Sequence, residues 1–174
     1  MATIQTTTYS SITDTAAITI TLDNLAASST LLAGRASTAV ANTSDLYRDV
    51  LVFGQITTGT TLTAGQIQVL AIAPLKLASS TYTWPVATAT ALTGSDEAAT
   101  WEAGQKAQLR TGAVIATNTT NSRKYQIQPF SLAALFGEVP LSWKVFVTQS
   151  SNANLDNTGG LNWLHYTGIK YTAT

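Results

Sequence analysis

The single histidine of the chain, His165, is the residue whose chemistry is easiest to propose, because an imidazole titrates near neutral pH and can act as a general base. A base for nucleophilic catalysis also needs a nucleophile and an acid that orients the ring. The sequence has no Gly-x-Ser-x-Gly elbow that would supply such a nucleophile. Because Leu164 and Tyr166 flank the histidine in a pattern typical of a strand, we interpret His165 as a structural residue.

Carboxylates are the second possible source of chemistry, since two of them can cleave a glycosidic bond when they face each other across it. The nine acidic residues are scattered, and no spacing between them indicates such a pair. Several stand in polar segments that are typical of solvated loops: Asp96, Glu97, Glu102 and Glu138. We therefore predict no catalytic residues, and we expect that the protein is not an enzyme.

The segment 150–160 is rich in oxygen donors, which calcium prefers as ligands. It holds one carboxylate, Asp156, and lacks the spacing of an EF-hand loop, and its Asn and Gly residues are also those that a long turn needs. The chain has no cysteine, and one histidine cannot build a multi-histidine site. We predict a turn here, with no bound metal ion and no other cofactor.

Charge in this chain is low and balanced, because nine Lys and Arg residues offset nine Asp and Glu residues among 174. A nucleic-acid-binding protein needs a basic surface that follows the phosphates, so we expect no nucleic-acid partner. No apolar run approaches the length of a membrane span, and the N-terminal residues lack the basic and apolar regions of a signal peptide. We expect a soluble protein that is made in a cytoplasm and has no membrane partner.

The elements that must position any site are expected to be β-strands. Thr occurs 31 times, and its branched side chain suits a pleated sheet better than a helix. Residues 18–22 alternate Ile-Thr-Ile-Thr-Leu, which predicts a half-buried strand. Residues 50–53 are all apolar, which predicts a central strand covered on both faces, with a possible bulge at Gly54. Further strands are predicted over residues 67–73, 143–147 and 163–171.

Alternation in the last two of these strands also predicts where their side chains point. In the strand over 143–147, Trp143 shares one side with two valines, and Phe146 makes the other side apolar as well. In the C-terminal strand, one side carries Trp163, His165, Thr167, Ile169 and Tyr171, and the other carries Leu164, Tyr166, Gly168 and Lys170.

One short helix is predicted between the strands. Ser131 is a good N-cap for Leu132 to Phe136, Gly137 can end the helix in the left-handed conformation, and Pro140 prevents its continuation. A weaker helical pattern covers residues 95–106. Many short strands separated by turn signals are typical of a sandwich or jelly roll. The predicted fold is therefore all-β, a single antiparallel β-sandwich of jelly-roll type over residues 17–174, with one short connecting helix and an extended N-terminal arm over residues 1–16.

Three aromatic residues in polar or Thr-rich surroundings are candidates for an interface: Tyr82, Trp84 and Trp101. Exposed Trp and Tyr side chains often anchor protein contacts, and they also stack on sugars. The alternative is that these rings close the end of the sandwich as part of its core. The sequence leaves both interpretations open.

Two longer segments of the chain are distinctive: residues 37–52 (Ser-Thr-Ala-Val-Ala-Asn-Thr-Ser-Asp-Leu-Tyr-Arg-Asp-Val-Leu-Val) and residues 129–143 (Pro-Phe-Ser-Leu-Ala-Ala-Leu-Phe-Gly-Glu-Val-Pro-Leu-Ser-Trp). Both resemble segments that recur in small virion proteins of tailed bacteriophages. The second is followed by a strand, an Asn-rich turn and a closing strand with Tyr166 and Gly168. The resemblance extends over roughly residues 18–171, and it is least clear over residues 78–108.

The resemblance implies a jelly-roll structural protein of a phage particle, and it carries over no active-site residues. We expect a capsid decoration (cement) protein in the virion that binds the major capsid protein across subunits and stabilises the shell. The phage context also implies a homo-oligomer, a dimer or a trimer. The alternatives are a receptor- or glycan-binding module of a head or tail fibre, and a structural component of the tail or neck.

Overall fold

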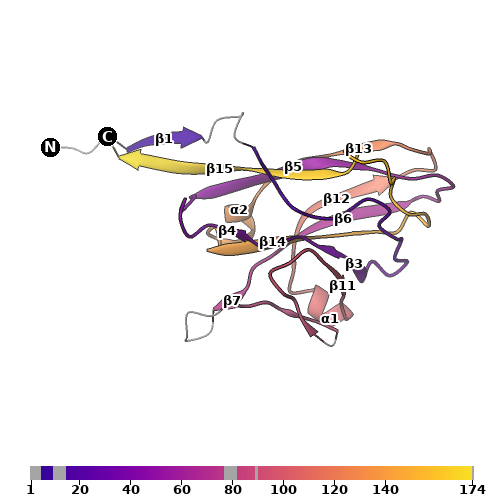
Figure 1. Ribbon diagram of the computed structural model, residues 1–174, viewed down its shortest axis with the longest axis horizontal. Helices are drawn as coiled ribbons and strands as arrows, with labels where there is room; N and C mark the ends of the chain where they lie inside the picture. Colours follow the sequence, from indigo (N-terminus) through magenta and orange to yellow (C-terminus); the bar gives the residue numbers. More distant parts are fainter. Residues whose placement is uncertain (1–4, 10–14, 77–81, 89, 174) are drawn as a thin grey trace.

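The computed structural model describes residues 5–9, 15–76, 82–88 and 90–173, and it contains two packed antiparallel sheets with a smaller layer beneath them (Figure 1). Sheet A has the strand order β1-β15-β5-β13, and β2 pairs with the same strand as β1. Sheet B has the order β11-β3-β14-β6-β12, with β4 beside β14. The fold is thus an all-β sandwich, as the sequence predicts.

The strands of sheet A are β1 (Gln5–Tyr9), β2 (Ala16–Ala17), β5 (Asp49–Thr57), β13 (Lys124–Ser131) and β15 (Trp163–Ala173). The strands of sheet B are β3 (Ala33–Ala36), β4 (Val40–Ala41), β6 (Gly65–Ile72), β11 (Glu97–Thr100), β12 (Arg110–Thr117) and β14 (Ser142–Gln149). The two short hairpins pair β7 (Leu75–Lys76) with β8 (Tyr82–Thr83) and β9 (Val86–Ala87) with β10 (Thr90–Ala91). The helices are α1 (Ala103–Lys106) and α2 (Leu132–Phe136).

The order in which the chain visits the two sheets is that of a jelly roll. Counting β3 and β4 as one strand and leaving out the short insertions, eight strands follow one another as β2, β3/β4, β5, β6, β12, β13, β14 and β15. Sheet A then holds the first, eighth, third and sixth of them, and sheet B holds the second, seventh, fourth and fifth. This wrapping of two Greek keys is the jelly-roll topology, so the expected architecture is confirmed at the level of topology.

The main core lies between the two sheets. Alternate residues of β5, β6, β14 and β15 point into it, including Val52, Val69, Val145 and Leu164, each of which is buried. Trp143 packs against Tyr166 with its ring edge toward the other ring, at 5.2 Å between centroids. The predicted alternation of β14 and β15 is therefore confirmed, because each strand sends one side of its pattern into this core.

Residues 18–22 do not form the predicted strand, although their alternation places Ile18 and Leu22 in the main core. Their backbone connects the two sheets: the Ile18 amide donates to the carbonyl of Leu164 in sheet A, and the Thr19 carbonyl accepts from the amide of Thr38 near sheet B. The segment thus closes one edge of the sandwich. A pattern of period two shows that one side of an extended segment is buried, but it does not show that the segment belongs to a ladder.

The strand prediction over residues 50–53 is correct in position and wrong in two respects. β5 is central, since it pairs with β13 on one side and β15 on the other. Its inner residues are buried, but Leu51 and Phe53 on the outer face are not covered. The predicted bulge is also displaced: Gly54 keeps regular register, and the irregularity lies in β13 between Ile127 and Phe130.

Gly54 is needed for a close approach between strands. A Cβ atom at this position would stand 2.3 Å from the Trp163 carbonyl oxygen and 2.6 Å from Leu164 Cδ2. Neither distance is compatible with a side chain, so the inner face of β5 has a glycine where β15 packs most tightly against it.

Helix α2 has the predicted capping residues at both ends. The Ser131 hydroxyl accepts a hydrogen bond from the Ala134 amide, and Gly137 ends the helix with φ of 84°. Asp49 fixes the same helix to β5, because its carboxylate accepts from the Ser131 hydroxyl at 2.8 Å and from the Ala133 amide at 3.1 Å. Of the weaker helical pattern over 95–106, only α1 at its end is helical, and residues 97–100 form β11. The connecting helices are therefore two, not one.

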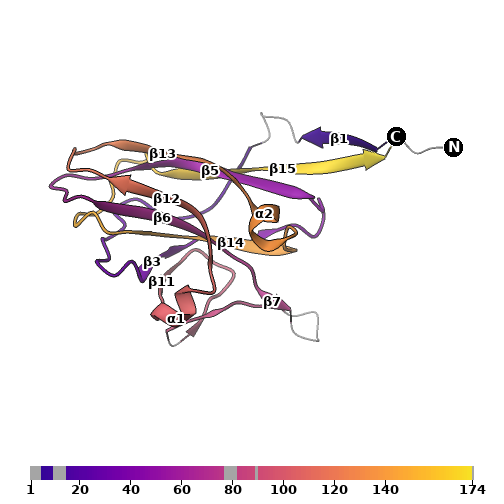
Figure 2. The ribbon, with the colours of Figure 1, turned by 180° about the vertical axis from the view of Figure 1, so that it is seen from behind.

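The connection between β6 and β12, residues 73–109, forms the additional layer beneath sheet B (Figure 2). We call it the insertion. Its described residues carry β7 to β10 and α1, which cover the outer face of sheet B with a second apolar core, and β11, which joins the edge of sheet B beside β3. It nearly coincides with residues 78–108, the part of the chain in which the phage resemblance is least clear.

The predicted N-terminal arm contributes strand β1, which pairs with the last five residues of β15 in the register Gln5 to Ala173 and Tyr9 to Ile169. This two-stranded ribbon extends past the end of β5 and projects from the sandwich body (Figure 1). The boundary of the arm at residue 16 remains a prediction.

Candidate functional site

The aromatic residues chosen as interface candidates do not form a surface. Trp101 is 1% exposed and Trp84 is 8% exposed, and both belong to the second core between sheet B and the insertion. Trp101 packs edge-on against Phe146 of β14 at 5.8 Å between centroids. The interface interpretation is therefore wrong for these two rings, because a side chain covered by its own chain offers no area to a partner. Tyr82 is in β8, and its side chain lies outside the described part of the structure.

A buried lysine fastens the insertion to sheet B. Lys144 of β14 is 0% exposed, and its ammonium donates to the carbonyls of Thr93 and Ser95 and to the Glu97 carboxylate, at 2.8, 2.9 and 2.6 Å. The same ammonium lies 5.5 Å from the centroid of the Trp84 ring. Burial lowers the pKa of Lys144, and the hydrogen bond and ion pair with Glu97 offset part of that effect. All its donors have acceptors, so this is a structural contact.

Asp96, one of the acids considered for catalysis, has structural partners as well. Asp96 accepts from Arg35 Nε at 2.6 Å and from the amide of Thr21 at 3.0 Å. Burial raises the pKa of Asp96, but the hydrogen bonds from Arg35 and Thr21 outweigh it and the pKa lies below its ordinary value. Within the described residues, no three His, Cys, Asp or Glu side chains come together as metal ligands would.

The segment 150–160, considered as a calcium loop, is organised by its own hydrogen bonds. The Asp156 carboxylate accepts from the Thr158 amide at 2.8 Å, and Leu155 forms an isolated bridge with Thr58.

Helices α1 and α2 each have fewer than two turns, so in the described residues neither has the length that a membrane-crossing helix requires.

The outer face of sheet A has no covering layer among the described residues. In Figure 1, β13, β5 and β15 form one side of the molecule, and apart from β1 at the far end of β15 no described element is drawn outside them. We call this surface the open face and define it by eight outward side chains: Leu51, Phe53, Gln55, Gln126, Gln128, Trp163, His165 and Thr167. Only His165 among them is titratable, so a partner could cover the face without stripping water from a carboxylate or an ammonium.

An aromatic cluster lies at the centre of the open face. The ring of Phe53 is 6.4 Å from that of Trp163 and 6.3 Å from that of His165, and the last two are 5.0 Å apart. All three side chains are partly exposed. His165 thus has two aromatic neighbours, and its interpretation as a structural residue stays a prediction.

Sequence reasoning placed two of these rings correctly but did not recognise the site. The predicted alternation of the C-terminal strand already put Trp163 and His165 on one side. The register of β15 with β5 then brings Phe53 opposite His165. The signal was therefore present in the alternation, but the sequence did not reveal that this side of the sheet is uncovered.

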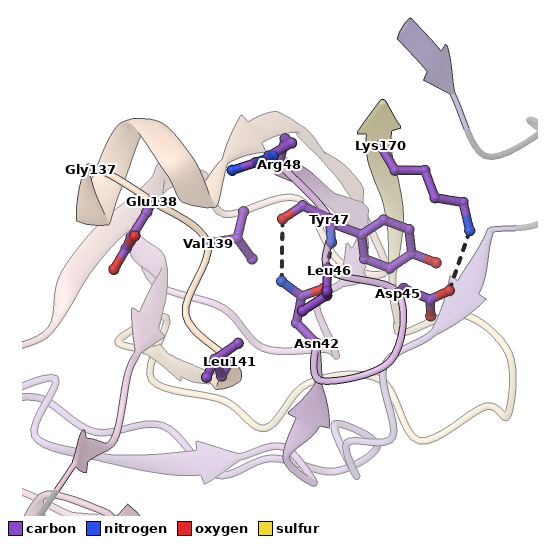
Figure 3. A pocket seen from close by; sticks show the side chains of 10 residues that line it. All are labelled: Asn42, Asp45, Leu46, Tyr47, Arg48, Gly137, Glu138, Val139, Leu141 and Lys170. Carbon is purple, nitrogen blue, oxygen red and sulfur yellow. Dashed lines mark hydrogen bonds and ion pairs between the residues drawn. The ribbon is translucent and has the colours of Figure 1, made fainter. Parts of the chain in front are cut away.

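A second surface feature is a hollow of about 710 Å³ between two turns (Figure 3). One wall is the turn 42–48 before β5, and the other is the segment 137–141 after α2, with Lys170 of β15 at the edge. These walls come from the two segments that carry the phage resemblance. The fold brings them together, since the amide of Asn42 donates to the carbonyl of Leu141 at 2.8 Å.

The turn 42–48 is held from inside by Asn42. Its side-chain oxygen accepts from the Tyr47 amide at 2.7 Å, and its side-chain nitrogen donates to the Tyr47 carbonyl at 3.2 Å. Lys170 contacts the turn from the other side, at 3.4 Å from the Asp45 carboxylate and 5.7 Å from the centroid of the Tyr47 ring. The turn therefore has a defined shape, and the large apolar side chain that it exposes is Leu46.

Comparisons of this chain with protein-family models, with curated proteins and with solved structures found no match.

Proposed function

We propose that this protein is a structural protein of a tailed-bacteriophage particle, a capsid decoration protein that binds across capsid subunits and stabilises the shell. The resemblance of residues 37–52 and 129–143 to phage virion segments is the reason for naming the particle. The observation that carries the binding role is the open face, with its partly exposed cluster of Phe53, Trp163 and His165. Its partner is the major capsid protein, and it acts in the virion after synthesis in the host cytoplasm.

The chemistry of the open face suits a permanent protein contact. Aromatic rings provide large apolar area with few rotatable bonds, and the glutamines Gln55, Gln126 and Gln128 provide donors and acceptors at the margin. The eight side chains that define the face include neither a carboxylate nor an ammonium group, and Lys124, two residues before Gln126 on the same side of β13, lies at its margin, so salt would act on this contact mainly through one charge. A shell under internal pressure needs contacts of that kind.

The jelly roll supports the same role through rigidity and repetition. Side chains on one face of a paired sheet keep fixed spacings, so the contact surface is preformed in the free protein. Specific contacts typically bury about 1,200–2,000 Å² in total. When several copies joined to one another bind neighbouring sites, effective concentration raises the overall affinity well above that of one contact.

The test is binding to capsids of the parent phage that lack this protein. The wild-type chain should sediment with the shells and raise the temperature at which they rupture. Trp163→Ser and Phe53→Ser should fold normally and lose both effects. Val114→Ser is the matched control, because Val114 is 54% exposed on β12 of sheet B and lies outside the open face; it should behave as wild type.

Two results would count against this proposal in different ways. If the wild-type chain neither sediments with the shells nor changes their rupture temperature, the decoration role is wrong. If it binds and Trp163→Ser binds equally well, the role stands and the open face is not the contact.

A glycan- or receptor-binding module remains the second candidate, because one tryptophan ring, that of Trp163, is accessible on the open face. The sugar-stacking role first considered for Trp84 and Trp101 is replaced by this residue. Binding to host cell envelopes or to a glycan array, lost in Trp163→Ser, would favour this candidate over the decoration role. Location in the tail or neck would be recognised by sedimentation with those parts instead of with shells.

A further inference from the structure

Two leucines of this chain adopt the left-handed backbone conformation, and the comparison between them points to a second contact surface. Leu31 has φ of 58° and Leu46 has φ of 50°, a region that is unfavourable for a branched apolar residue. Leu31 is 8% exposed, so packing within the chain offsets its backbone strain. Leu46 is 59% exposed. The hydrogen bonds between Asn42 and Tyr47 hold the backbone of this turn, but they do not cover the Leu46 side chain.

A turn alone does not require leucine at position 46. Glycine or asparagine would adopt the same backbone angle at lower energy and would expose no apolar side chain. Strained residues that the local structure does not need tend to occur at functional positions. The side chain of Leu46 is therefore the feature to explain, and a partner that covers it is the simplest explanation.

The hollow beside Leu46 has the size and the charges for such a partner. Its volume of about 710 Å³ can accept several apolar side chains, and Val139 and Leu141 lie along the far wall. Of the charged groups on its rim, Asp45 and Lys170 pair with each other. Arg48 on one wall and Glu138 on the other are exposed, and neither belongs to an ion pair in the described part of the chain.

We propose that the hollow is a self-association surface, in which two copies of this chain exchange Leu46 across a two-fold axis. Leu46 is itself part of the wall of the hollow, so a copy that inserts its own leucine necessarily presents its own hollow to the other copy. The contact is then reciprocal, which is the property of a two-fold dimer. In this arrangement, Arg48 of each copy pairs with Glu138 of the other. Because the net charge of the chain is zero, two copies do not repel each other through their overall charge.

This inference goes beyond shell binding, and it is tested on the protein alone. Sedimentation velocity from about 1 to about 100 µM should show a monomer–dimer equilibrium. Leu46→Gly should raise the dimer dissociation constant by about tenfold or more, because each dimer loses two buried leucines. Its melting temperature, measured at a concentration where wild type is monomeric, should be equal or higher, since glycine relieves the strain at this position.

A charge exchange distinguishes a direct contact from a structural role. Arg48→Glu and Glu138→Arg should each weaken the dimer, because each variant places like charges opposite each other. The double variant should restore the dimer by restoring opposite signs. Val114→Ser, on sheet B, is the control that removes an equally exposed apolar side chain, and it should leave the dimer unchanged.

Three outcomes would overturn the inference. They are a wild-type monomer at every concentration, a wild-type trimer, or a dimer that Leu46→Gly and the single charge variants leave intact. Because shell binding is not part of this measurement, failure here leaves the decoration role standing. Conversely, a dimer that does not bind shells supports the inference without the decoration role.

Discussion

The two sheets of this jelly roll both carry aromatic side chains on their outer faces, but only one sheet is sealed. Phe146 of sheet B lies under the insertion and packs against Trp101. Phe53 of sheet A lies on the open face beside Trp163, with no described element above it. The difference shows that an outward aromatic residue in a strand has two distinct uses, and that the length of one connection, residues 73–109, decides between them.

The sealed face also contains a fully buried lysine, Lys144. The Lys144 side-chain nitrogen lies under the insertion with three acceptors around it. The open face has no comparable group. A surface that binds a partner avoids the cost of desolvating charged groups if it has none. A face that is covered within the folded chain can include a charged group if each of its donors has an acceptor.

The largest difference between the faces is expected when the same charge is introduced at the two phenylalanines. Phe146→Asp buries an unpaired carboxylate in the second core, and we expect the chain not to fold. Phe53→Asp leaves the carboxylate in reach of water, so the chain should fold and lose about 1 kcal/mol of stability. Circular dichroism and urea unfolding measure both. An unfolded Phe53→Asp variant would mean that the open face is covered after all.

Replacing Trp101 or Trp163 by alanine should again destabilise the sealed face more than the open face, by a smaller margin than the charge does. Trp101→Ala should lower the free energy of unfolding by about 3–5 kcal/mol, because it leaves a large cavity between the insertion and sheet B. Trp163→Ala should lower it by about 1 kcal/mol, since the ring is only partly buried. Denaturant titration of both variants under one set of conditions gives the comparison. Equal losses would contradict the assignment of the two faces.

The lysine under the insertion should have an intermediate effect that depends on pH. Lys144→Met should cost about 1–3 kcal/mol at neutral pH, because Glu97 and two carbonyls lose their donor. Burial lowers the pKa of Lys144 in the folded state. Between that pKa and the ordinary lysine value, the unfolded chain binds more protons, so the free energy of unfolding of wild type should rise with pH relative to Lys144→Met.

The pH dependence is checked by urea unfolding of both proteins at a series of alkaline pH values. Their difference cancels the titration of other groups that the two proteins share. A difference that falls as pH rises would show that the folded state favours the ammonium, which contradicts the stated direction of the pKa.

The smallest effect on stability is expected at the glutamines of the open face. Gln128→Lys adds a charge at an exposed position of β13, so the free energy of unfolding should change by less than about 0.5 kcal/mol. Under the proposed function, shell binding should nevertheless weaken, because the ammonium must lose water in the contact. Sedimentation with shells checks this, and unchanged binding would place Gln128 outside the contact.

Much of the fold could be predicted because it depends on neighbours in the sequence. Ser131 and Gly137 cap α2 as expected, since both caps act within one or two turns. The alternation of β14 and β15 gave the correct inner sides. The errors arose where one local pattern is compatible with two tertiary structures. Residues 18–22 bury alternate side chains without pairing in a sheet. The β-bulge predicted at Gly54 lies instead in the neighbouring strand β13.

The candidate site was less predictable for the same reason. Trp84 and Trp101 stand in polar sequence, so they appeared exposed, yet contacts with Phe146 and Lys144 of a distant strand bury them. The hollow could not be anticipated either, since its walls are separated by about ninety residues and meet where β4 pairs with β14 and the Asn42 amide donates to Leu141.

The amino-acid sequence by itself determined the strands, their two-sided character, the helix caps and the near absence of charge, because these follow from side-chain shape and from spacing along the chain. Only the tertiary structure decided which outer face is covered, which tryptophan is partly exposed, and that Leu46 lines a hollow together with residues 137–141. Coverage is a relation between segments that are far apart in the sequence, and alternation within a strand contains no information about what lies above it.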